Sequence, residues 1–169
     1  QRLSPAETIS AAQGGLSLED CMLHFRHIQA REIMASHAAW IAEAKPVFGP
    51  ESQERFDWAA GVTEAQAAPA REARDTFAAR LTDLLGDDAL LCLPAAPGDS
   101  DAEALKTHRS AVLSLTSIAG LARLPQVTLP LARVEGCPLG LSLIAPRGAD
   151  EDLLAFCEAF CATEERLDL

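Results

Sequence analysis

The chain has 169 residues, 49% of them hydrophobic and 23% charged, and its 25 Asp and Glu residues outnumber its 14 Lys and Arg residues, for a formal net charge of −11. This length and composition are typical of one folded domain and exclude a disordered, collagen-like or coiled-coil chain. The negative charge repels phosphate backbones and anionic lipid headgroups, and no apolar run approaches the roughly 20 residues of a membrane span. We therefore expect no nucleic acid and no membrane among the partners of this protein.

The first regular pattern in the chain follows a stretch of small and polar residues. We expect residues 1–16 to form a loose lead-in and residues 17–169 to form one structured segment. Because the chain does not start with Met, we expect it to be a piece of a processed or longer protein. Ser17 and Asp20 have the spacing of a capping box, and the apolar residues that follow at helical spacing predict a long helix that Pro46 ends.

Two more helices are predicted before the pattern changes. Residues 51–60 read as a short helix, and residues 70–85 predict a stronger one that Pro69 opens and Gly86 caps. The inward stripe of the stronger helix is predicted to contain Ala73, Phe77, Leu81, Leu84 and Leu85. The part from residue 17 to residue 86 is therefore expected to be helical.

The pattern then changes to a strand followed by a helix. Residues 89–93 form a short apolar run that Pro94 ends, which is typical of a strand buried on both faces. After a loop rich in Pro, Ala, Gly and Asp, residues 106–119 predict a helix that ends at Gly120.

A hairpin is predicted after this helix. Residues 126–131 and 139–144 have the composition of strands, and Glu135-Gly136 between them favours a turn. Pro130 supplies no N–H to a strand ladder, so we expect the first of these strands to lie at an edge or to contain a bulge.

One helix ends the chain, and the fold class follows from the order of elements. Residues 151–163 predict a helix with Asp150 as its N-cap, so residues 87–169 read as strand, helix, hairpin and helix. The chain is thus predicted to be an α/β protein with a mixed sheet flanked by helices. Three strands are few for five helices, so we expect part of the apolar helix surface to pack against polypeptide outside this chain.

The cysteine and histidine patterns contain no metal or disulfide signature. The five cysteines are scattered, odd in number and mostly within apolar segments, which indicates reduced core thiols in a cytoplasmic protein: Cys21, Cys92, Cys137, Cys157 and Cys161. His24 and His27 are spaced to share a helix face, but no third ligand converges with them. We expect neither a metal nor a cofactor.

One group of polar residues forms a candidate site. Thr107, Ser110, Ser114 and Ser117 place four hydroxyls along one stripe of the helix over 106–119. Such a stripe is either a surface whose hydroxyls bond back to their own helix or a polar wall of a small-molecule pocket.

From Asp88 onward, an apolar strand with a proline-rich loop, a helix, two strands and a final helix follow one another in the chain. The motifs in this order are Leu90-Leu91-Cys92-Leu93-Pro94-Ala95-Ala96-Pro97, Ser117-Ile118-Ala119-Gly120, Pro125-Gln126-Val127-Thr128-Leu129-Pro130 and Pro138-Leu139-Gly140-Leu141-Ser142-Leu143-Ile144-Ala145. Together they resemble the C-terminal portion of the amidase signature family, serine hydrolases of carboxamides. These residues and the earlier Arg26-His27-Ile28-Gln29-Ala30-Arg31-Glu32 look similar to bacterial amidases related to plant indole-3-acetamide hydrolase.

This resemblance implies a catalytic triad of a Ser nucleophile, a cis-Ser and a Lys, which family members carry in a Gly- and Ser-rich first half. This chain has no Gly-Gly-Ser-Ser-Gly run, and neither Lys45 nor Lys106 is assigned the catalytic role. The resemblance therefore implies the C-terminal portion of an amide hydrolase, inactive alone, whose partners are the N-terminal half and a small-molecule amide. It also implies that the substrate pocket is lined by Pro94, Ala95, Thr107, Ser110, Ser114 and Ser117.

Two other functions stay open from the sequence. The chain can be a binding or scaffold module derived from an amidase half, without catalysis in any context. It can also be an independent cysteine enzyme that pairs Cys137 with His108, although no third group orients such a pair. An unpaired sheet edge and exposed apolar surface further predict self-association into a homo-oligomer.

Overall fold

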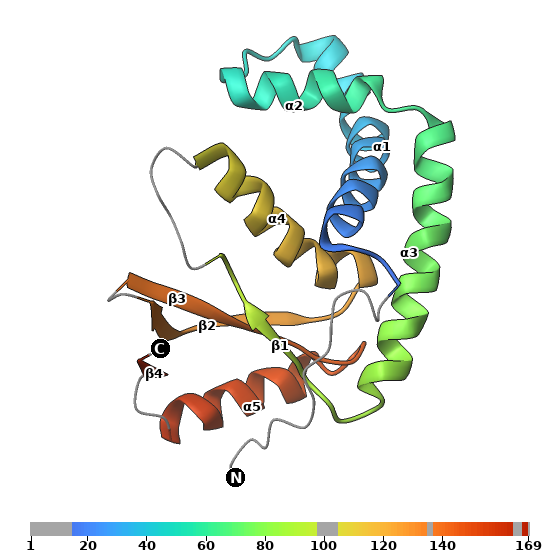
Figure 1. Ribbon diagram of the computed structural model, residues 1–169. Coiled ribbons are helices and arrows are strands. Elements are labelled where there is room, and N and C mark those ends of the chain that lie inside the picture. Colours follow the sequence, from blue (N-terminus) through green and yellow to red (C-terminus); the bar gives the residue numbers. More distant parts are fainter. Residues whose placement is uncertain (1–14, 98–104, 135–136, 164–166, 169) are drawn as a thin grey trace.

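A computed structural model of the chain describes residues 15–97, 105–134, 137–163 and 167–168. Along the chain, the elements are α1 (Leu18–Ala44), α2 (Pro50–Gly61), α3 (Glu64–Leu85), β1 (Leu91–Pro94), α4 (Leu105–Ala122), β2 (Gln126–Val134), β3 (Cys137–Ile144), α5 (Asp150–Thr163) and β4 (Leu167–Asp168). Helices α1, α3 and α4 lie on one side of the sheet and α5 lies on the other (Figure 1). The predicted α/β fold is confirmed, whereas the lead-in over residues 1–16 falls mostly outside the described residues.

The sheet has the strand order β1-β3-β2-β4. Strand β3 pairs antiparallel with β1 and with β2, so the predicted hairpin is confirmed, and its turn at Glu135-Gly136 lies outside the described residues. The short strand β4, which the sequence did not predict, pairs parallel with β2. Among the described residues, the outer edge of β1 has no paired strand.

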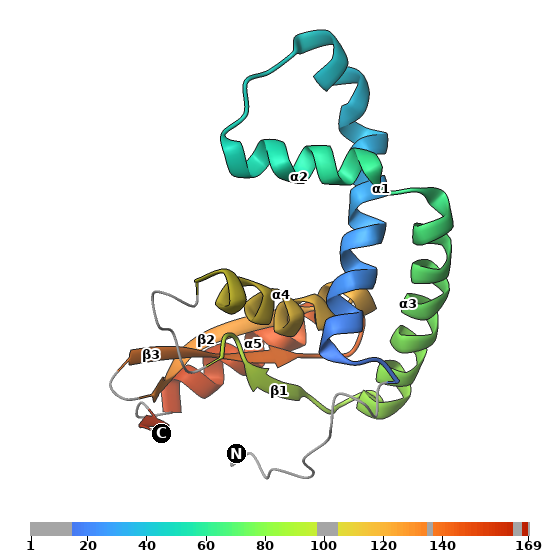
Figure 2. The same cartoon turned by 45° about the horizontal axis from the view of Figure 1, so that its top comes forward.

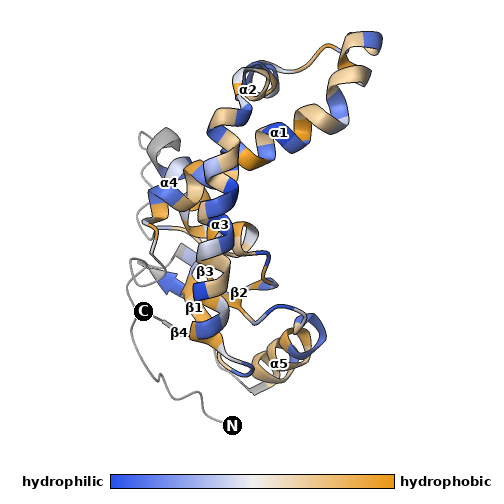
Figure 3. Cartoon of the chain, turned by 90° about the vertical axis from the view of Figure 1, so that its right-hand side faces the viewer, coloured by the Kyte–Doolittle hydropathy of each residue, from blue (hydrophilic) through white to orange (hydrophobic). Residues whose placement is uncertain are grey.

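Two hydrophobic clusters cover the two faces of the sheet. On the first face, Ile144 of β3 packs with buried residues of α1, α3 and α4, among them Cys21, Phe77 and Leu121. On the other face, Leu143 packs with buried residues of β2 and α5 that include Leu129, Leu153 and Cys157. Because neighbouring strand residues point to opposite faces, the adjacent residues Leu143 and Ile144 belong to different clusters. Figure 3 shows hydrophilic and hydrophobic residues mixed along α1 and α3.

The far end of α1 and all of α2 project from the rest of the molecule (Figure 2). Aromatic rings pack together in this arm. Phe48 stacks on Phe56 with ring centroids 4.5 Å apart, and the Phe48 and Trp40 rings meet edge-on with centroids 6.2 Å apart. A third buried cluster, Ala30 with Ala59 and Val62, joins α1 to α2. The arm is therefore held by its own small core.

The observed helix boundaries confirm the predicted start of α1 and correct the predicted start of α3. Ser17 and Asp20 form the predicted capping box of α1. Helix α3 begins at Glu64, six residues before the predicted start, because Thr63 and Gln66 form a capping box of their own and Pro69 is accommodated inside the helix. Gly86 caps α3 as predicted. Leu84, predicted to face inward, is 42% exposed.

The end of α4 also differs from the prediction. Gly120 lies inside α4, and the residue that ends the helix in the left-handed conformation is Arg123, with φ +59°. Gly120 is needed for a different reason: a Cβ there would lie 3.0 Å from the Phe25 ring of α1. The missing side chain permits the close approach of α1 and α4.

The sequence predicts that strand β1 is buried on both faces, and this prediction is wrong. Leu91 and Leu93 are half-buried, and Cys92 and Pro94 are exposed. Only the face of β1 toward the helices is covered, because α5 extends along the other strands. Cys161 is exposed as well, so the thiols are not all core residues.

Candidate functional site

A polar cluster interrupts the apolar face of the sheet that α1, α3 and α4 cover. The Ser142 hydroxyl accepts a hydrogen bond from Gln126 Nε2 at 3.0 Å and lies 2.9 Å from Thr128 Oγ1. Ser142 is fully buried, Gln126 is half-buried and Thr128 is exposed. The cluster therefore leads from solvent at Thr128 into the protein, and its three members come from β2 and β3 alone.

The irregularity around Pro130 creates this cluster. Near the hairpin turn, Ala132 pairs with Leu139, and a regular ladder continued from there would place Leu143 opposite Thr128. The register shifts by one residue between Leu129 and Ala132, which brings Ser142 opposite Thr128 instead. The prediction that Pro130 lies in a bulge is confirmed, and the bulge is what directs both hydroxyls to the same face.

Gly140 brings the loop after β1 against the cluster. The Ala95 N–H donates to the Gly140 carbonyl at 2.8 Å. A Cβ at Gly140 would lie 2.6 Å from Thr128 Cγ2 and 3.0 Å from Ala95 Cβ, so a residue without a side chain is required there. Two predicted site residues, Pro94 and Ala95, thus lie beside the polar cluster that the sequence analysis did not identify.

Two hydroxyls of the α4 stripe are bonded to their own helix. Ser114 donates to the Ala111 carbonyl at 2.8 Å, and Ser117 donates to the Ser114 carbonyl at 3.0 Å. Ser117 is buried, Ser114 is half-buried and Ser110 is exposed. Thr107 lies in the first turns of α4, and its side chain is outside the described residues. No hydrogen bond joins the described hydroxyls of the stripe to Ser142 or Thr128.

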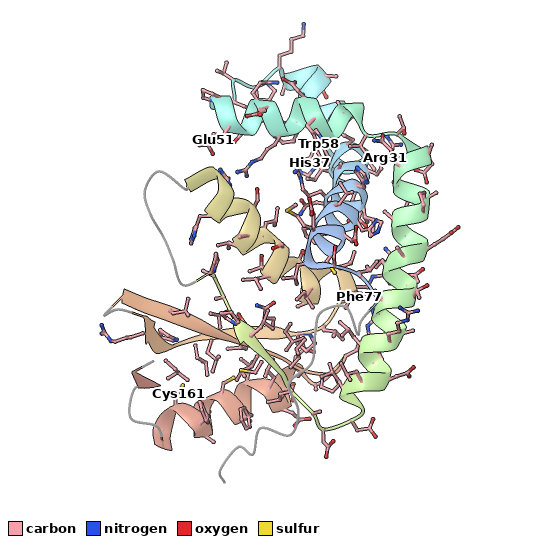
Figure 4. All side chains as sticks on the ribbon, in the orientation of Figure 1. Arg31, His37, Glu51, Trp58, Phe77 and Cys161 are labelled. Carbon is pink, nitrogen blue, oxygen red and sulfur yellow. The ribbon has the colours of Figure 1, made fainter. Side chains whose placement is uncertain are left out.

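The α2 arm reaches α4 through an ion pair. Glu51 of α2 points toward α4 (Figure 4), and its Oε2 accepts from Arg109 Nη1 at 3.0 Å. Arg109 is adjacent to Ser110 in the first half of α4. The pair is a surface contact between the arm and the helix that carries the stripe.

The described side chains hold no activated nucleophile. No described hydroxyl shares a hydrogen bond with a lysine or histidine nitrogen, which is what a serine needs for activation. Burial raises the pKa of the Cys21 thiol to about 11 and also raises the pKa values of Cys92 and Cys157, so these thiols are held in the unreactive protonated form. His108 Nδ1 is buried without a hydrogen-bond partner. The side chain of Cys137, which the cysteine-enzyme hypothesis pairs with His108, is outside the described residues.

In the described part of the chain, no three His, Cys, Asp or Glu residues are grouped so that they could hold a metal ion. No helix in the same residues is both long and apolar enough to cross a bilayer.

Comparison with known proteins identifies relatives of this chain. Amidase 1 of Arabidopsis thaliana is 34% identical over 142 residues, which cover 81% of this chain and 33% of the relative. Outer envelope protein 64, chloroplastic, of Arabidopsis thaliana is 28% identical over 135 residues, covering 75% of this chain and 22% of that protein. The crystal structure of an amidase matches with a TM-score of 0.70 and 25% identity over 93% of this chain and 37% of that one. No protein-family model matches the chain.

The chain forms a four-stranded sheet with helices on both faces, and an amidase structure matches nearly the whole chain. This architecture is that of part of an amidase. By sequence and by fold, this chain is related to the amidase signature family. It spans about one third of the length of the Amidase 1 relatives that it matches.

Proposed function

We propose that the chain is the C-terminal portion of an amide hydrolase that converts a carboxamide into a carboxylate and ammonia or an amine. The Ser, cis-Ser and Lys that such a reaction uses in the family would come from an N-terminal half of the same enzyme. The observation that carries this proposal is that relatives named Amidase 1 match over most of this chain and over only a third of their own length.

The free edge and open face of β1 support a larger sheet. The outer edge of β1 carries backbone donors and acceptors that no described strand pairs with, and Cys92 and Pro94 are exposed on the face that α5 leaves open. An unpaired edge is a template for a further strand. In this proposal, the N-terminal half extends the sheet from β1, so the loop at Pro94 and Ala95 comes to lie between the two halves.

We propose the wall of the substrate pocket from the predicted residues and the polar cluster together. Pro94, Ala95, Thr107, Ser110, Ser114 and Ser117 remain the candidates from the sequence. Thr128 is added because it is an exposed residue whose hydroxyl contacts Ser142 and whose methyl group packs beside Gly140. Pockets for small molecules commonly combine apolar surface with a few such oriented hydroxyls.

The test is ammonia release from a panel of carboxamides by the protein that contains this segment together with the N-terminal half. We expect activity with both halves and none with the chain alone. Thr128→Val should lower kcat/KM by about fivefold if the hydroxyl orients the substrate, since one hydrogen bond to a substrate contributes on the order of 1 kcal/mol. Thr116→Val is the matched control, because that exposed hydroxyl bonds to the Val112 carbonyl of its own helix.

The same assay separates the proposal from a scaffold role. A protein that carries both halves, folds, and hydrolyses no carboxamide would favour a binding module without catalysis. Activity of the chain alone, lost when Cys137 is replaced, would favour a cysteine enzyme.

We place the protein in the cytoplasm as part of this proposal, because the four cysteines whose side chains are described are free thiols. A relative is named as a chloroplast outer envelope protein, so attachment to a membrane is the competing outcome. Fractionation of cells that express the tagged protein distinguishes a soluble pool from a membrane-bound one.

A further inference from the structure

A cavity of about 260 Å³ lies between α3, the turn that follows α4 and the loop between β3 and α5. Its lining includes Leu121 and Leu124, which are buried in the core, and none of the residues of the polar cluster. Three arginines from three separate segments also line it: Arg74, Arg123 and Arg147. The lining of the cavity thus combines buried apolar residues with three arginines.

The charges of this cavity are not balanced. Asp75 is its only acidic lining residue, and its Oδ1 accepts from Arg74 Nε at 2.8 Å. The hydrogen bond from Arg74 lowers the pKa of Asp75, and the positive charge of Arg123 contributes to that lowering. Among the described residues, no ion pair engages Arg123 or Arg147. Three positive charges therefore face one negative charge in a protein whose formal net charge is −11.

The position of Arg123 depends on an unusual backbone conformation. Its φ of +59° is in the left-handed region, which glycine adopts without steric cost and which other residues rarely adopt. The turn is fixed by the Leu124 N–H, which donates to the Ala119 carbonyl at 3.0 Å. This turn holds an arginine at the wall of the cavity, although glycine would fit the backbone better.

We propose that this cavity binds a small organic anion, whose phosphate or carboxylate oxygens lie between the guanidinium groups and whose apolar part contacts Leu121 and Leu124. Guanidinium groups bind such oxygens through paired, charge-assisted hydrogen bonds. Bringing like charges together costs free energy that a bound anion offsets. The volume is near the lower limit of small-molecule sites, so the ligand is no larger than a single ring with its anionic group.

The test is calorimetric titration of the full chain with inorganic phosphate, benzoate and benzyl alcohol at one fixed, low ionic strength. We expect saturable binding of benzoate with one site and at least about tenfold weaker binding of the neutral alcohol, because the anion makes the charged contacts. Phosphate tests the anionic group without the apolar part, so phosphate binding alone would restrict the ligand class to phosphates. If phosphate and benzoate both fail to bind, or the alcohol binds as tightly as benzoate, the proposal is wrong.

Two substitutions and a control locate the site. Arg123→Gly removes the charge and suits the left-handed backbone, and Arg147→Gln removes a second charge; each should weaken binding by about tenfold. Arg55→Gln is the matched control, an exposed arginine of α2 outside the cavity. Equal weakening by all three variants would mean general charge attraction and would overturn the site.

The wild-type chain provides a measurement that does not depend on the folding of variants. Phenylglyoxal modifies accessible arginines, and mass spectrometry reports each position. Benzoate should protect Arg123 and Arg147 and leave Arg55 unprotected. Unchanged modification of Arg123 and Arg147 at saturating benzoate would contradict the proposal.

Discussion

The hydroxyl oxygens of Thr128 on β2 and Ser142 on β3 lie 2.9 Å apart, opposite each other in the sheet. They meet because the register shifts near Pro130. They lie on the same face of the sheet as Ile144, the face that α1, α3 and α4 cover. Ser142 is buried and Thr128 is exposed, so one hydroxyl anchors the other at the surface.

Ser142→Ala should lower the free energy of unfolding by about 1 to 2 kcal/mol, because Gln126 loses its buried hydrogen-bond acceptor while exposed Thr128 can bond to water instead. Urea unfolding of the purified variant measures the change. Thr116→Ala on the exposed surface of α4 serves as the control and should stay within about 0.5 kcal/mol of wild type. Equal stability of Ser142→Ala and wild type would show that the buried bond contributes nothing.

Gly140→Ala should destabilise the protein by about 1 to 3 kcal/mol, because the new methyl group would overlap Thr128 Cγ2 and crowd Ala95. Adding Thr128→Ser removes that Cγ2 and should restore part of the loss, which a thermal unfolding series can measure.

Gly61→Ala is the control for the Gly140 variant. Nothing lies within 4 Å of a Cβ at Gly61, the last residue of α2, so alanine is tolerated there or stabilises by up to about 1 kcal/mol. If both alanine variants behave alike, steric overlap at Gly140 is not the cause.

Stability should fall as the pH rises from about 9 to about 11, and Cys21 should contribute to this fall. Burial raises the pKa of its thiol from 9.0 to about 11, so between these values the unfolded chain releases the proton while the folded chain keeps it. The contribution is fully present below pH 9 and is on the order of 2 to 3 kcal/mol. Unfolding of Cys21→Ala at pH 8 and pH 10.5 should show a smaller pH effect than wild type; an identical effect would assign it to other groups.

The ion pair between Arg109 and Glu51 should contribute about 1 kcal/mol or less, because the two side chains are 60% and 77% exposed. A double-mutant cycle with Arg109→Gln and Glu51→Gln measures the coupling, which should decrease from low salt to 0.5 M NaCl because salt screens exposed charges. Coupling that is unaffected by salt would argue against a solvent-exposed pair. Arg55→Gln is a useful comparison, since Arg55 lies 3.8 Å from the same carboxylate.

The chain alone should self-associate, because Trp40 and Leu154 are 48% and 60% exposed and the outer edge of β1 is unpaired among the described strands. Light scattering should give a mass above the 18.0 kDa of one chain that increases with concentration. A constant mass of one chain, without binding of a hydrophobic dye, would show that these surfaces need no partner.

Local signals in the sequence predicted most of the elements. Helix α1 was found because Ser17 and Asp20 form a cap within four residues, and the hairpin was found because strand and turn residues are neighbours in the chain. The start of α3 was missed because Pro69 resembles a first-turn residue, whereas the Thr63–Gln66 capping box places the start earlier. The sequence pattern around Gly120 is typical of a helix end, but Gly120 lies inside α4 and packs against Phe25. No local pattern in the sequence shows that contact.

The sequence by itself determined the α/β order of elements, the irregularity at Pro130 and the resemblance to amidases, because these depend on residues close together in the chain. Only the tertiary structure decided that Thr128 lies opposite Ser142, that Ala95 packs closely against Gly140, and that three arginines line one cavity. A one-residue shift in register changes the face to which each strand residue points, and turns of different elements meet only once the core has packed. Those relationships therefore arise from packing between distant segments.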